Sequence, residues 1–591
     1  MRCVLMLLST ALLAQLGPVP SQEQISRPVP AVLEGFVFQA GSDDPIPKAQ
    51  VTLTRMITIP PNQAAGTPLP PNPQIPPIET DRAGKFSFRD LEPGQYRLAA
   101  GKNGFVRANY GERTSGAVGS TIILAAGQTM KDANFRLVQT AAISGRVRFA
   151  SGEPGAGMGV QVLKTSYSTT GQRNFQTVGS GRTDDRGEYR IFWMSPGRYY
   201  LAIMTSRNLL TLVSVEGVII SGNGSTNEIA TAGLPTVFYP GVVDPLRAST
   251  IEVGAGREAS NIDVVLPPTP VYRVRGRLLD ASGQPPRSAS ISLVSRDTSI
   301  SGLSTSASTN YNSTSGIFEL RDVLPGSYWI RAQASESTAT ATIPASAVGR
   351  TLSEALSTIT SNRSFAQMPL EVRDDIDGVA LNMTAGLSVS GILRVEGQPI
   401  QAATPPRVTL RSTASNGLAP SLQPTNADGT FTVSNVFPGE YRVFVTPIPP
   451  DYYIKEARIE QTDVLNQPWV IAEAIRGNLE VVLSSGAGQI DGTVLDAKAQ
   501  PVSAIPVVLI PDQDRGRSEL FRFGNTDAMG KFTLRGIPPG NYKIFAWENL
   551  EANAYYDPEI LRTYEQQGRV VRVEQGSKLT AEVKLIPARA Q

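Results

Sequence analysis

Short runs in which apolar and polar residues alternate occur along most of the chain. Examples are "AQVTL" (49–53), "SISL" (290–293) and "PRVTL" (406–410), in which valine, isoleucine or leucine stands at every second position. A period of two with β-branched residues is typical of a half-buried strand. Hardly any segment shows the 3.6-residue period of an amphipathic helix. The pattern therefore predicts an all-β protein.

A longer motif recurs five times, and one copy reads "TDAMGKFTLRGIPPGNYKIFAW" (526–547). In each copy a glycine stands ten positions before the glycine of a Pro-Gly pair, and a tyrosine follows that second glycine by two positions. The first set of glycines is Gly84, Gly187, Gly316, Gly429 and Gly530. The second set is Gly94, which follows Pro93, with Gly197, Gly326, Gly439 and Gly540. The tyrosines are Tyr96, Tyr199, Tyr328, Tyr441 and Tyr542.

Each part of this motif has a physical reason. An Asp or Asn side chain can accept a hydrogen bond from the backbone N–H two residues on, and the glycine after it can take a positive φ, so the first half predicts a hairpin turn. In Pro-Gly, proline presets φ for the second turn position and glycine supplies the positive φ of the third, which predicts a type II turn. The buried tyrosine hydroxyl then needs a partner, which predicts a hydrogen bond to backbone at this corner. The hairpin side chains are Asp81, Asp184, Asn426 and Asp527, with Ser313 in the third copy.

Each copy also opens with an apolar strand that carries a glycine, and closes with two strands around a polar turn. The opening glycines lie 110, 131, 115 and 101 residues apart along the chain. About seven short strands per repeat is typical of a β-sandwich. We therefore predict five tandem seven-stranded sandwich modules, joined by short linkers into a semi-rigid, monomeric rod. The opening glycines are Gly35, Gly145, Gly276, Gly391 and Gly492.

The chain start resembles a secretory signal peptide, because one arginine precedes an apolar run from Cys3 to Leu16 and then Gly, Pro and small residues. No later segment has about 18 apolar residues in a row, so no membrane span is expected in the mature chain. We expect the protein in the periplasm or at the outer cell surface. The predicted organisation is a signal peptide at 1–21, module 1 at 22–139 with a proline-rich loop at 56–80, module 2 at 140–270, module 3 at 271–387 with a Ser/Thr/Ala-rich insertion at 333–364, module 4 at 388–486, and module 5 at 487–591.

The glycine-bearing first strand, the "TDxxGxF" hairpin and the "PGxY" turn together resemble the carboxypeptidase regulatory-like domain. This resemblance implies a transthyretin-like, or prealbumin-like, sandwich of the carbohydrate-binding-like fold, related to collagen-binding B-type repeats. It implies no catalytic residues, since the family serves as an accessory module. Some related B-type domains form Lys–Asn crosslinks, but no lysine, acid and asparagine recur here at matching places.

The composition removes most catalytic chemistry. The chain has no histidine, and its one cysteine lies in the predicted signal peptide, so His-dependent nucleophiles, most zinc sites and disulfides are excluded. We expect no enzyme, no cofactor and no resident metal, although composition alone leaves a carboxylate-pair glycosidase open. Calcium at the acidic turn of Asp374, Asp375 and Asp377 stays open beside a plain solvated turn. Because 54 basic residues balance 52 acidic ones, nothing indicates a nucleic-acid partner.

Aromatic loops between the PGxY strand and the closing strands are the candidate ligand-binding sites. Exposed aromatics on a rigid sandwich could stack on sugar rings or on a peptide, or could equally plug the end of the sandwich. Two functions follow: a secreted module that binds polysaccharide or an envelope glycan, and a structural spacer or adhesin-like scaffold for an envelope protein. Exposure of these tyrosines on one face would favour the first, and burial at module junctions the second. They are Tyr110, Tyr239, Tyr452, Tyr453, Tyr555 and Tyr556.

Overall fold

The computed structural model describes residues 29–56, 75–112, 119–204, 214–215, 218–219, 235–296, 308–336, 362–396, 405–413, 420, 425–472 and 474–588. Strands dominate these residues, which confirms the all-β prediction. The predicted signal peptide, residues 57–74 of the proline-rich loop and residues 337–361 of the predicted insertion lie outside the described residues. The ends of that insertion are strand: residues 333–336 and 362–364 belong to β25 and β26, which pair with each other in register.

Buried apolar residues gather into five main clusters, one for each copy of the motif. They lie at residues 31–137, 141–266, 274–383, 389–483 and 490–583. We call the corresponding parts of the chain modules 1 to 5; their boundaries remain those predicted above. Each module therefore has a core of its own.

The first two modules contain the following elements. Module 1 has β1 (Ala31–Gln39), β2 (Gln50–Met56), β3 (Ile78–Glu79), β4 (Lys85–Leu91), β5 (Gly94–Gly101), β6 (Ala108–Asn109), β7 (Ile122–Leu124), β8 (Thr129–Met130) and β9 (Phe135–Leu137). Module 2 has β10 (Ala141–Phe149), β11 (Gly159–Tyr167), β12 (Arg173–Arg182), β13 (Glu188–Met194), β14 (Gly197–Met204), β15 (Ser214–Val215), β16 (Val218–Ile219), β17 (Val237–Phe238), η2 (Pro245–Arg247), β18 (Ile251–Val253), β19 (Glu258–Ala259) and β20 (Val264–Leu266).

The last three modules follow the same order. Module 3 has β21 (Tyr272–Leu279), β22 (Ser290–Ser295), β23 (Ser308–Tyr311), β24 (Ile317–Val323), β25 (Gly326–Glu336), β26 (Asn362–Val372), β27 (Ile376–Asn382) and β28 (Thr384–Ala385). Module 4 has β29 (Leu387–Glu396), β30 (Arg407–Ser412), β31 (Thr430–Val436), β32 (Gly439–Thr446), β33 (Tyr452–Ile459), β34 (Thr462–Asp463), β35 (Trp469–Ile471) and β36 (Leu479–Ser485). Module 5 has β37 (Gly488–Leu495), β38 (Pro506–Pro511), η4 (Ser518–Leu520), β39 (Arg522–Asn525), β40 (Lys531–Ile537), β41 (Gly540–Trp547), η5 (Ala554–Tyr556), α2 (Pro558–Arg562), η6 (Glu565–Gln567), β42 (Arg569–Val573) and β43 (Lys578–Ile586).

The opening strand is the centre of one sheet in every module. In module 1, β1 pairs antiparallel with the hairpin strand β4 on one side and parallel with β8 and β9 on the other. The equivalent opening strands β10, β21, β29 and β37 have the same two kinds of neighbour. The PGxY strand pairs antiparallel with the alternating strand in a second layer, as β5 does with β2.

The opening glycine leaves room for an aromatic ring on the neighbouring strand. Gly492 lies directly opposite Phe532, and a Cβ at Gly492 would overlap both that ring and the carbonyl oxygen of Ala581 on the parallel strand β43. The same pairing, glycine opposite a buried aromatic, occurs in all five modules, with tyrosine as the ring in module 2. The pairs are Gly35 with Phe86, Gly145 with Tyr189, Gly276 with Phe318, Gly391 with Phe431, and Gly492 with Phe532.

The hairpin prediction is confirmed in modules 1, 2 and 5. Asp81 Oδ1 accepts hydrogen bonds from the backbone N–H groups of residues 83 and 85, at 2.9 and 2.8 Å, and the following glycine has a φ of +73°. Asp184 and Asp527 make the same contacts. In module 3 the capping side chain is Asn312 rather than Ser313, because that turn is one residue longer. In module 4 Asp428, not Asn426, accepts the bond from residue 430.

The threonine before the hairpin has a role that the sequence reading did not assign. The Thr526 hydroxyl is buried, donates to the carbonyl oxygen of Val502 and accepts the N–H of Ile505, each at 2.8 Å. Thr80 and Thr183 bind the same two positions in their modules. The hairpin is thereby fixed to the loop that follows the opening strand.

The PGxY corner is built differently from a type II turn. The Pro-Gly glycines of modules 1 to 4 have φ values of 153 to 159°, well away from the roughly +80° of that turn, so the turn type was wrong. The reversal instead includes a β-bulge in which the residue four positions before the glycine is left-handed, with φ between 56 and 70°. These residues are Asp90, Trp193, Asp322, Asn435 and Gly536.

The predicted tyrosine hydrogen bond is confirmed in modules 1, 2, 4 and 5. The hydroxyls of Tyr96, Tyr441 and Tyr542 donate to the carbonyl oxygen four residues earlier at 2.6, 2.8 and 2.9 Å, and Tyr199 does the same with Ser195. All five motif tyrosines are buried, at 5% exposure or less. The ring folds back over the Pro-Gly glycine: a Cβ at Gly540 would lie 3.2 Å from Cε2 of Tyr542.

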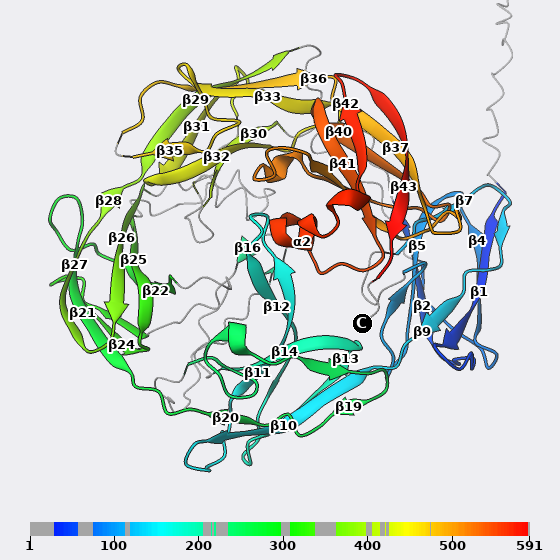
Figure 1. The fold of residues 1–591 in the computed structure, drawn as a ribbon, viewed down its shortest axis with the longest axis horizontal. Coiled ribbons are helices and arrows are strands. Elements are labelled where there is room, and N and C mark those ends of the chain that lie inside the picture. Colours follow the sequence, from blue (N-terminus) through cyan, green and yellow to red (C-terminus); the bar gives the residue numbers. More distant parts are fainter. Residues whose placement is uncertain are drawn as a thin grey trace, which may run out of the picture.

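The modules follow one another around a roughly circular path instead of a rod (Figure 1). Module 5 meets module 2 there: residue Ser166 forms a parallel bridge with Ala552, and the Tyr167 N–H donates to the Ala552 carbonyl oxygen at 3.0 Å. The rod expected from the short linkers is therefore not the arrangement found. Linker length limits the angle between neighbours, but it does not decide which distant modules touch.

A paired substitution in module 2 tests the close backbone packing at the opening glycine. Gly145→Ala puts a methyl group into the backbone of Ile262, so it should destabilise the module by about 3 kcal/mol. Gly254→Ala is the control, because its Cβ would meet only the flexible Arg257 side chain, at 3.3 Å. Native-state hydrogen exchange of module 2 amides measures both. Equal losses of stability in Gly145→Ala and Gly254→Ala would show that the module does not require the space beside Gly145.

A second substitution tests the corner tyrosine in module 5. Tyr542→Phe removes only the hydroxyl bonded to Pro538 and should cost about 1 kcal/mol. Tyr542→Ala also removes a buried ring and should cost about 3 to 5 kcal/mol. Unfolding in denaturant, monitored by hydrogen exchange of the β41 amides, separates the effect of the lost hydroxyl from the effect of the lost ring. A module as stable with alanine as with tyrosine would rule out a core role.

Candidate functional sites at the aromatic loops and module contacts

Tyr110 and Tyr239 pack against the cores of their own modules. The Tyr110 ring meets Phe135 edge to face at 6.2 Å, and burial raises the pKa of Tyr110. Tyr239 is half-buried against the core of module 2, and its N–H donates to the Leu201 carbonyl oxygen at 3.0 Å. Both rings are thus partly buried against the core of a sandwich.

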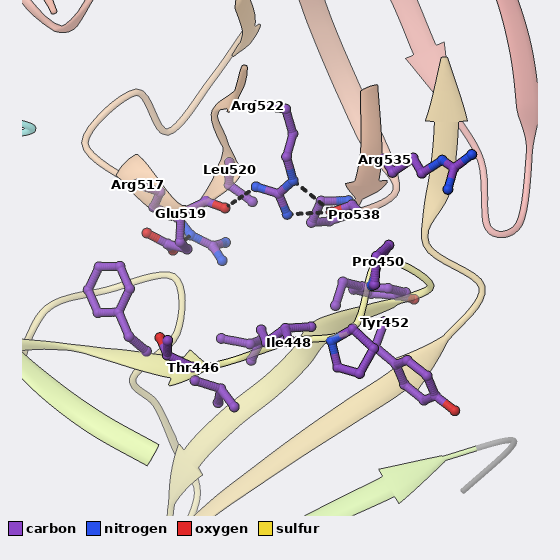
Figure 2. A pocket seen from close by; sticks show the side chains of 16 residues that line it. Thr446, Ile448, Pro450, Tyr452, Arg517, Glu519, Leu520, Arg522, Arg535 and Pro538 are labelled. Carbon is purple, nitrogen blue, oxygen red and sulfur yellow. Dashed lines mark hydrogen bonds and ion pairs between the residues drawn. The ribbon is translucent and has the colours of Figure 1, made fainter. Parts of the chain in front are cut away.

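Tyr452 and Tyr453 are 8% exposed each and lie where modules 4 and 5 meet. They line a pocket of about 420 Å³ between the two modules. Figure 2 shows its two walls: Thr446, Ile448, Pro450 and Tyr452 lie on the module 4 side, and η4 with the start of β39 lies opposite. These tyrosines are therefore part of a joint.

The module 5 wall of this pocket is polar, and two of its arginines, Arg517 and Arg522, are engaged in hydrogen bonds. Arg522 Nε donates to the Gly536 carbonyl oxygen at 2.9 Å, and Nη1 donates to that of Glu519 at 2.6 Å (Figure 2). Burial lowers the pKa of Arg522. Arg517 binds Glu519 at 2.7 Å and donates to Asn466 of module 4 at 2.5 Å. The buried charges thus connect the modules and order the loop before β39.

Tyr555 and Tyr556 belong to a satellite aromatic cluster on module 5. Tyr556 contacts Phe521 with ring centroids 4.7 Å apart, and Tyr555 lies 5.2 Å from Phe523 and 6.4 Å from Trp547. Burial raises the pKa of Tyr556 to about 12. Neither ring is an exposed surface residue.

The loop that contains Tyr555 and Tyr556 also contacts module 2. The turn of the β11–β12 hairpin lies against it so closely that a Cβ at Gly171 would come within 2.6 Å of the Tyr556 carbonyl oxygen. Tyr167 at the end of β11 is 9% exposed, and burial, with Glu551 nearby, raises its pKa to about 12. Two of the six predicted tyrosines are thus at the module 2–5 contact and two at the module 4–5 joint, so the structure does not bring the six together on one face.

One aromatic pair lies outside every predicted loop. Phe192 and Trp193, at the bulge of the module 2 corner, are 51% and 68% exposed, with their rings edge to face at 4.8 Å. Trp193 has a φ of +61°, a region that costs a side-chain-bearing residue about 1 to 2 kcal/mol. The sequence alone distinguishes this pair, because Phe-Trp stands where modules 1 and 3 have Arg-Asp.

The acidic turn considered for calcium is engaged in protein contacts. Asp375 accepts the Arg273 N–H at 2.9 Å and pairs with its guanidinium at 3.2 Å, and that backbone bond is the main cause of a lowered Asp375 pKa. Asp377 lies 3.9 Å from Arg275. Within the ranges described above, no group of three or more His, Cys, Asp or Glu side chains is placed to hold a metal ion. The solvated-turn alternative accounts for these contacts.

The described residues define a multi-module β-sandwich protein whose conspicuous side-chain clusters join modules. The family model of the carboxypeptidase regulatory-like domain matches residues 32–138, which confirms the resemblance for module 1. Modules 2 to 5 share its glycine–aromatic pair and its corner. A comparison with curated proteins found no match. No described helix is long and apolar enough to cross a membrane.

Several solved structures are similar at low identity. The Bacillus anthracis TIE protein is 11% identical, with 76% of this chain and 74% of that chain covered and a TM-score of 0.15. A Streptococcal ancillary pilin is 12% identical over 53% and 99% of the two chains, with a TM-score of 0.18. Shaft pilin SpaA from Lactobacillus rhamnosus GG is 10% identical over 41% and 99%, with a TM-score of 0.17. Similarity at such low TM-scores does not indicate a function.

The pH dependence of the module 5 loop can be tested at Glu565. Two bonds from Arg515, at 2.8 and 2.9 Å, and a contact with Lys543 lower the pKa of Glu565 from 4.5 to about 2. Because the folded pKa is the lower one, this stabilisation is complete above about pH 4.5 and is lost as pH falls towards 2. After allowance for solvent screening, Glu565→Gln should cost about 1 to 2 kcal/mol at pH 7 and little near pH 2.

Hydrogen exchange of module 5 at the two pH values measures this difference. Glu559→Gln is the matched control, since Glu559 is an exposed carboxylate on α2, the short helix that precedes η6. A Glu565→Gln effect of equal size at both pH values would contradict the role of the charge.

Proposed function

We propose that this protein is a non-catalytic scaffold of the cell envelope or its exterior, in which five sandwich modules are held in one arrangement to engage other molecules. The observation that carries this proposal is the position of the aromatic loops. Tyr453 lies at the joint of modules 4 and 5, and Tyr556 lies where module 5 meets module 2. Large rings such as those of Tyr452 and Tyr453 suit a joint because they bury much area with few rotatable bonds. The loop of Tyr556 meets module 2 through its backbone.

Polar contacts reinforce the joints between consecutive modules. At modules 3 and 4, the Arg363 N–H donates to Asn435 Oδ1 at 3.0 Å, and Phe365 packs on Phe437 with centroids 5.2 Å apart. At modules 4 and 5, Arg517 bonds to Asn466, and Gln575 donates to the Ser485 carbonyl oxygen at 3.3 Å. These contacts fix angles between modules that a bare linker would leave free.

The scaffold function is better supported than a sugar platform made by the six loop tyrosines. Those tyrosines are half-buried or buried, and they lie in different joints and cores. The envelope location rests on the apolar N-terminal segment, whose pattern is that of an export signal.

Solution scattering with a matched pair of variants tests the fixed arrangement. Gly171→Asn places a side chain against the Tyr556 carbonyl oxygen, whereas Gly152→Asn changes a turn with open space around it. Both positions have positive φ, which asparagine tolerates. We expect the natural chain and Gly152→Asn to scatter as one compact closed shape, and Gly171→Asn to show a larger radius of gyration.

Two results would overturn the proposal. Scattering from the natural chain that fits independently rotating modules would remove the fixed arrangement. Hydrolysis of peptide or glycan substrates that survives repurification would remove the non-catalytic assignment.

A further inference from the structure

The corner of module 2 exposes two aromatic rings at a position that other modules fill with polar residues. Counting back from the Pro-Gly pair, Phe192 and Trp193 align with Arg-Asp in modules 1 and 3, Ser-Asn in module 4 and Arg-Gly in module 5. The residue at the second position is left-handed in all five modules. Asp, Asn and Gly accept this conformation readily, but a tryptophan does not.

The fold therefore does not require tryptophan at this position. Four modules form the same bulge and bury the same tyrosine without an aromatic there. Strained residues persist where the surrounding structure holds them for a purpose, which is most often a binding site. Among the described residues of module 2, Trp193 is also the most exposed large apolar side chain, at 68%.

The equivalent corners of modules 4 and 5 are covered by the module before them. Asn435 of module 4 binds Arg363 of module 3, and Gly536 of module 5 lies against Pro450 of module 4. Module 2 also has a preceding module, yet its corner stays open. The aromatic pair is thus not part of a joint within the described residues.

A polar groove of about 620 Å³ continues along the same face of module 2. Glu188, Arg190 and Phe192 alternate along β13 with the buried Tyr189 and Ile191, so they project from one side of the sheet. Arg190 lies on the groove wall, and Phe192 follows it by two residues, which is about 7 Å along a strand. The aromatic pair therefore stands at one end of the groove.

The groove is polar but nearly balanced in charge. Arg190 binds Glu258 through two nitrogens at 2.9 to 3.2 Å, and Ser144 donates to the same carboxylate at 2.6 Å. Arg146 pairs with Glu188 at 2.5 Å. Three arginines thus face four carboxylates, so neither an acidic nor a basic polymer is favoured. The charged lining residues are Arg146, Arg182, Arg190, Asp184, Glu188, Glu258 and Asp263.

We propose that this face of module 2 binds a neutral polysaccharide, with one pyranose ring stacked on Trp193 and Phe192 and further hydroxyl groups bonded in the groove. A pyranose has an apolar C–H face and a polar rim, which matches aromatic rings beside fixed donors and acceptors. A protein partner would favour a larger apolar area with fewer charges at its centre. This site goes beyond the scaffold function and does not depend on the closed arrangement.

The test compares the full-length chain with a swap variant, Phe192→Arg with Trp193→Asp, that restores the residues of modules 1 and 3. The variant should fold with an equal or slightly higher melting temperature, since aspartate relieves the left-handed strain. Ile123→Ser, in module 1, controls for loss of an exposed apolar side chain, because Ile123 is 61% exposed. Probes are gels containing dextran, mixed-linkage glucan, xyloglucan or galactomannan, with alginate and anionic lipid vesicles for contrast.

At least one neutral polysaccharide should retard the natural chain and Ile123→Ser, with binding about tenfold or more weaker in the swap variant. Tryptophan fluorescence of the natural chain should shift to the blue on binding. The swap variant keeps the half-buried Trp329 and the buried Trp469 and Trp547 but lacks Trp193, so its fluorescence should not shift. The proposal is overturned if no neutral polysaccharide binds, or if the swap variant binds as well as the natural chain. It is also overturned if the swap removes only alginate binding, vesicle binding or self-association.

Discussion

The pairing of a glycine with an aromatic ring across two strands is the constraint on which each module depends. A side chain at Gly492 would overlap the Phe532 ring on one strand and the Ala581 carbonyl oxygen on another. Without a Cβ there, the ring can lie across the opening strand while the parallel closing strand keeps its hydrogen bonds. The ring thus fills the space between the two sheets, and the hairpin that carries it is held in register. The buried threonine and the corner tyrosine then fix the two ends of that hairpin.

Much of the module could be predicted from sequence because its determinants are local. Alternating residues, a capping side chain before glycine, and a tyrosine at fixed distance from Pro-Gly each act within a few residues, so their spacing survives in every copy. The turn type was missed because the bulge at Asp90 or Asn435 has no distinctive sequence motif. Any residue that tolerates a positive φ can occupy the position. The misassigned cap at Ser313 has a similar cause, since one extra residue in a turn moves the cap without disturbing the motif.

The candidate sites were harder to predict because they depend on contacts between modules. A loop that varies in length and keeps an aromatic is the pattern of a binding loop, but it is also the pattern of a joint between rigid bodies. Tyr453 lines a pocket with residues of module 5, and Tyr556 packs on Phe521, which is distant from it in the sequence. The sequence feature that indicates a binding site is instead a departure from the repeat. Phe192 and Trp193 form an aromatic pair at a position where the other modules have polar residues or glycine. A departure from a repeat is visible in sequence, whereas the neighbour across a joint is not.

The bridge between Ser166 and Ala552 also bears on the order in which the molecule forms. Each module has its own core, so an N-terminal module can fold as soon as it has been synthesised and, if exported, has crossed the membrane. The bridge cannot form until module 5 has emerged, because Ser166 belongs to module 2 and Ala552 to module 5. Until then the unpaired edge of the β11–β12 hairpin remains open to other chains. The contact between modules 2 and 5 therefore forms after the modules between them have been made, and a protein truncated within module 5 before Ala552 would consist of folded modules that cannot form it.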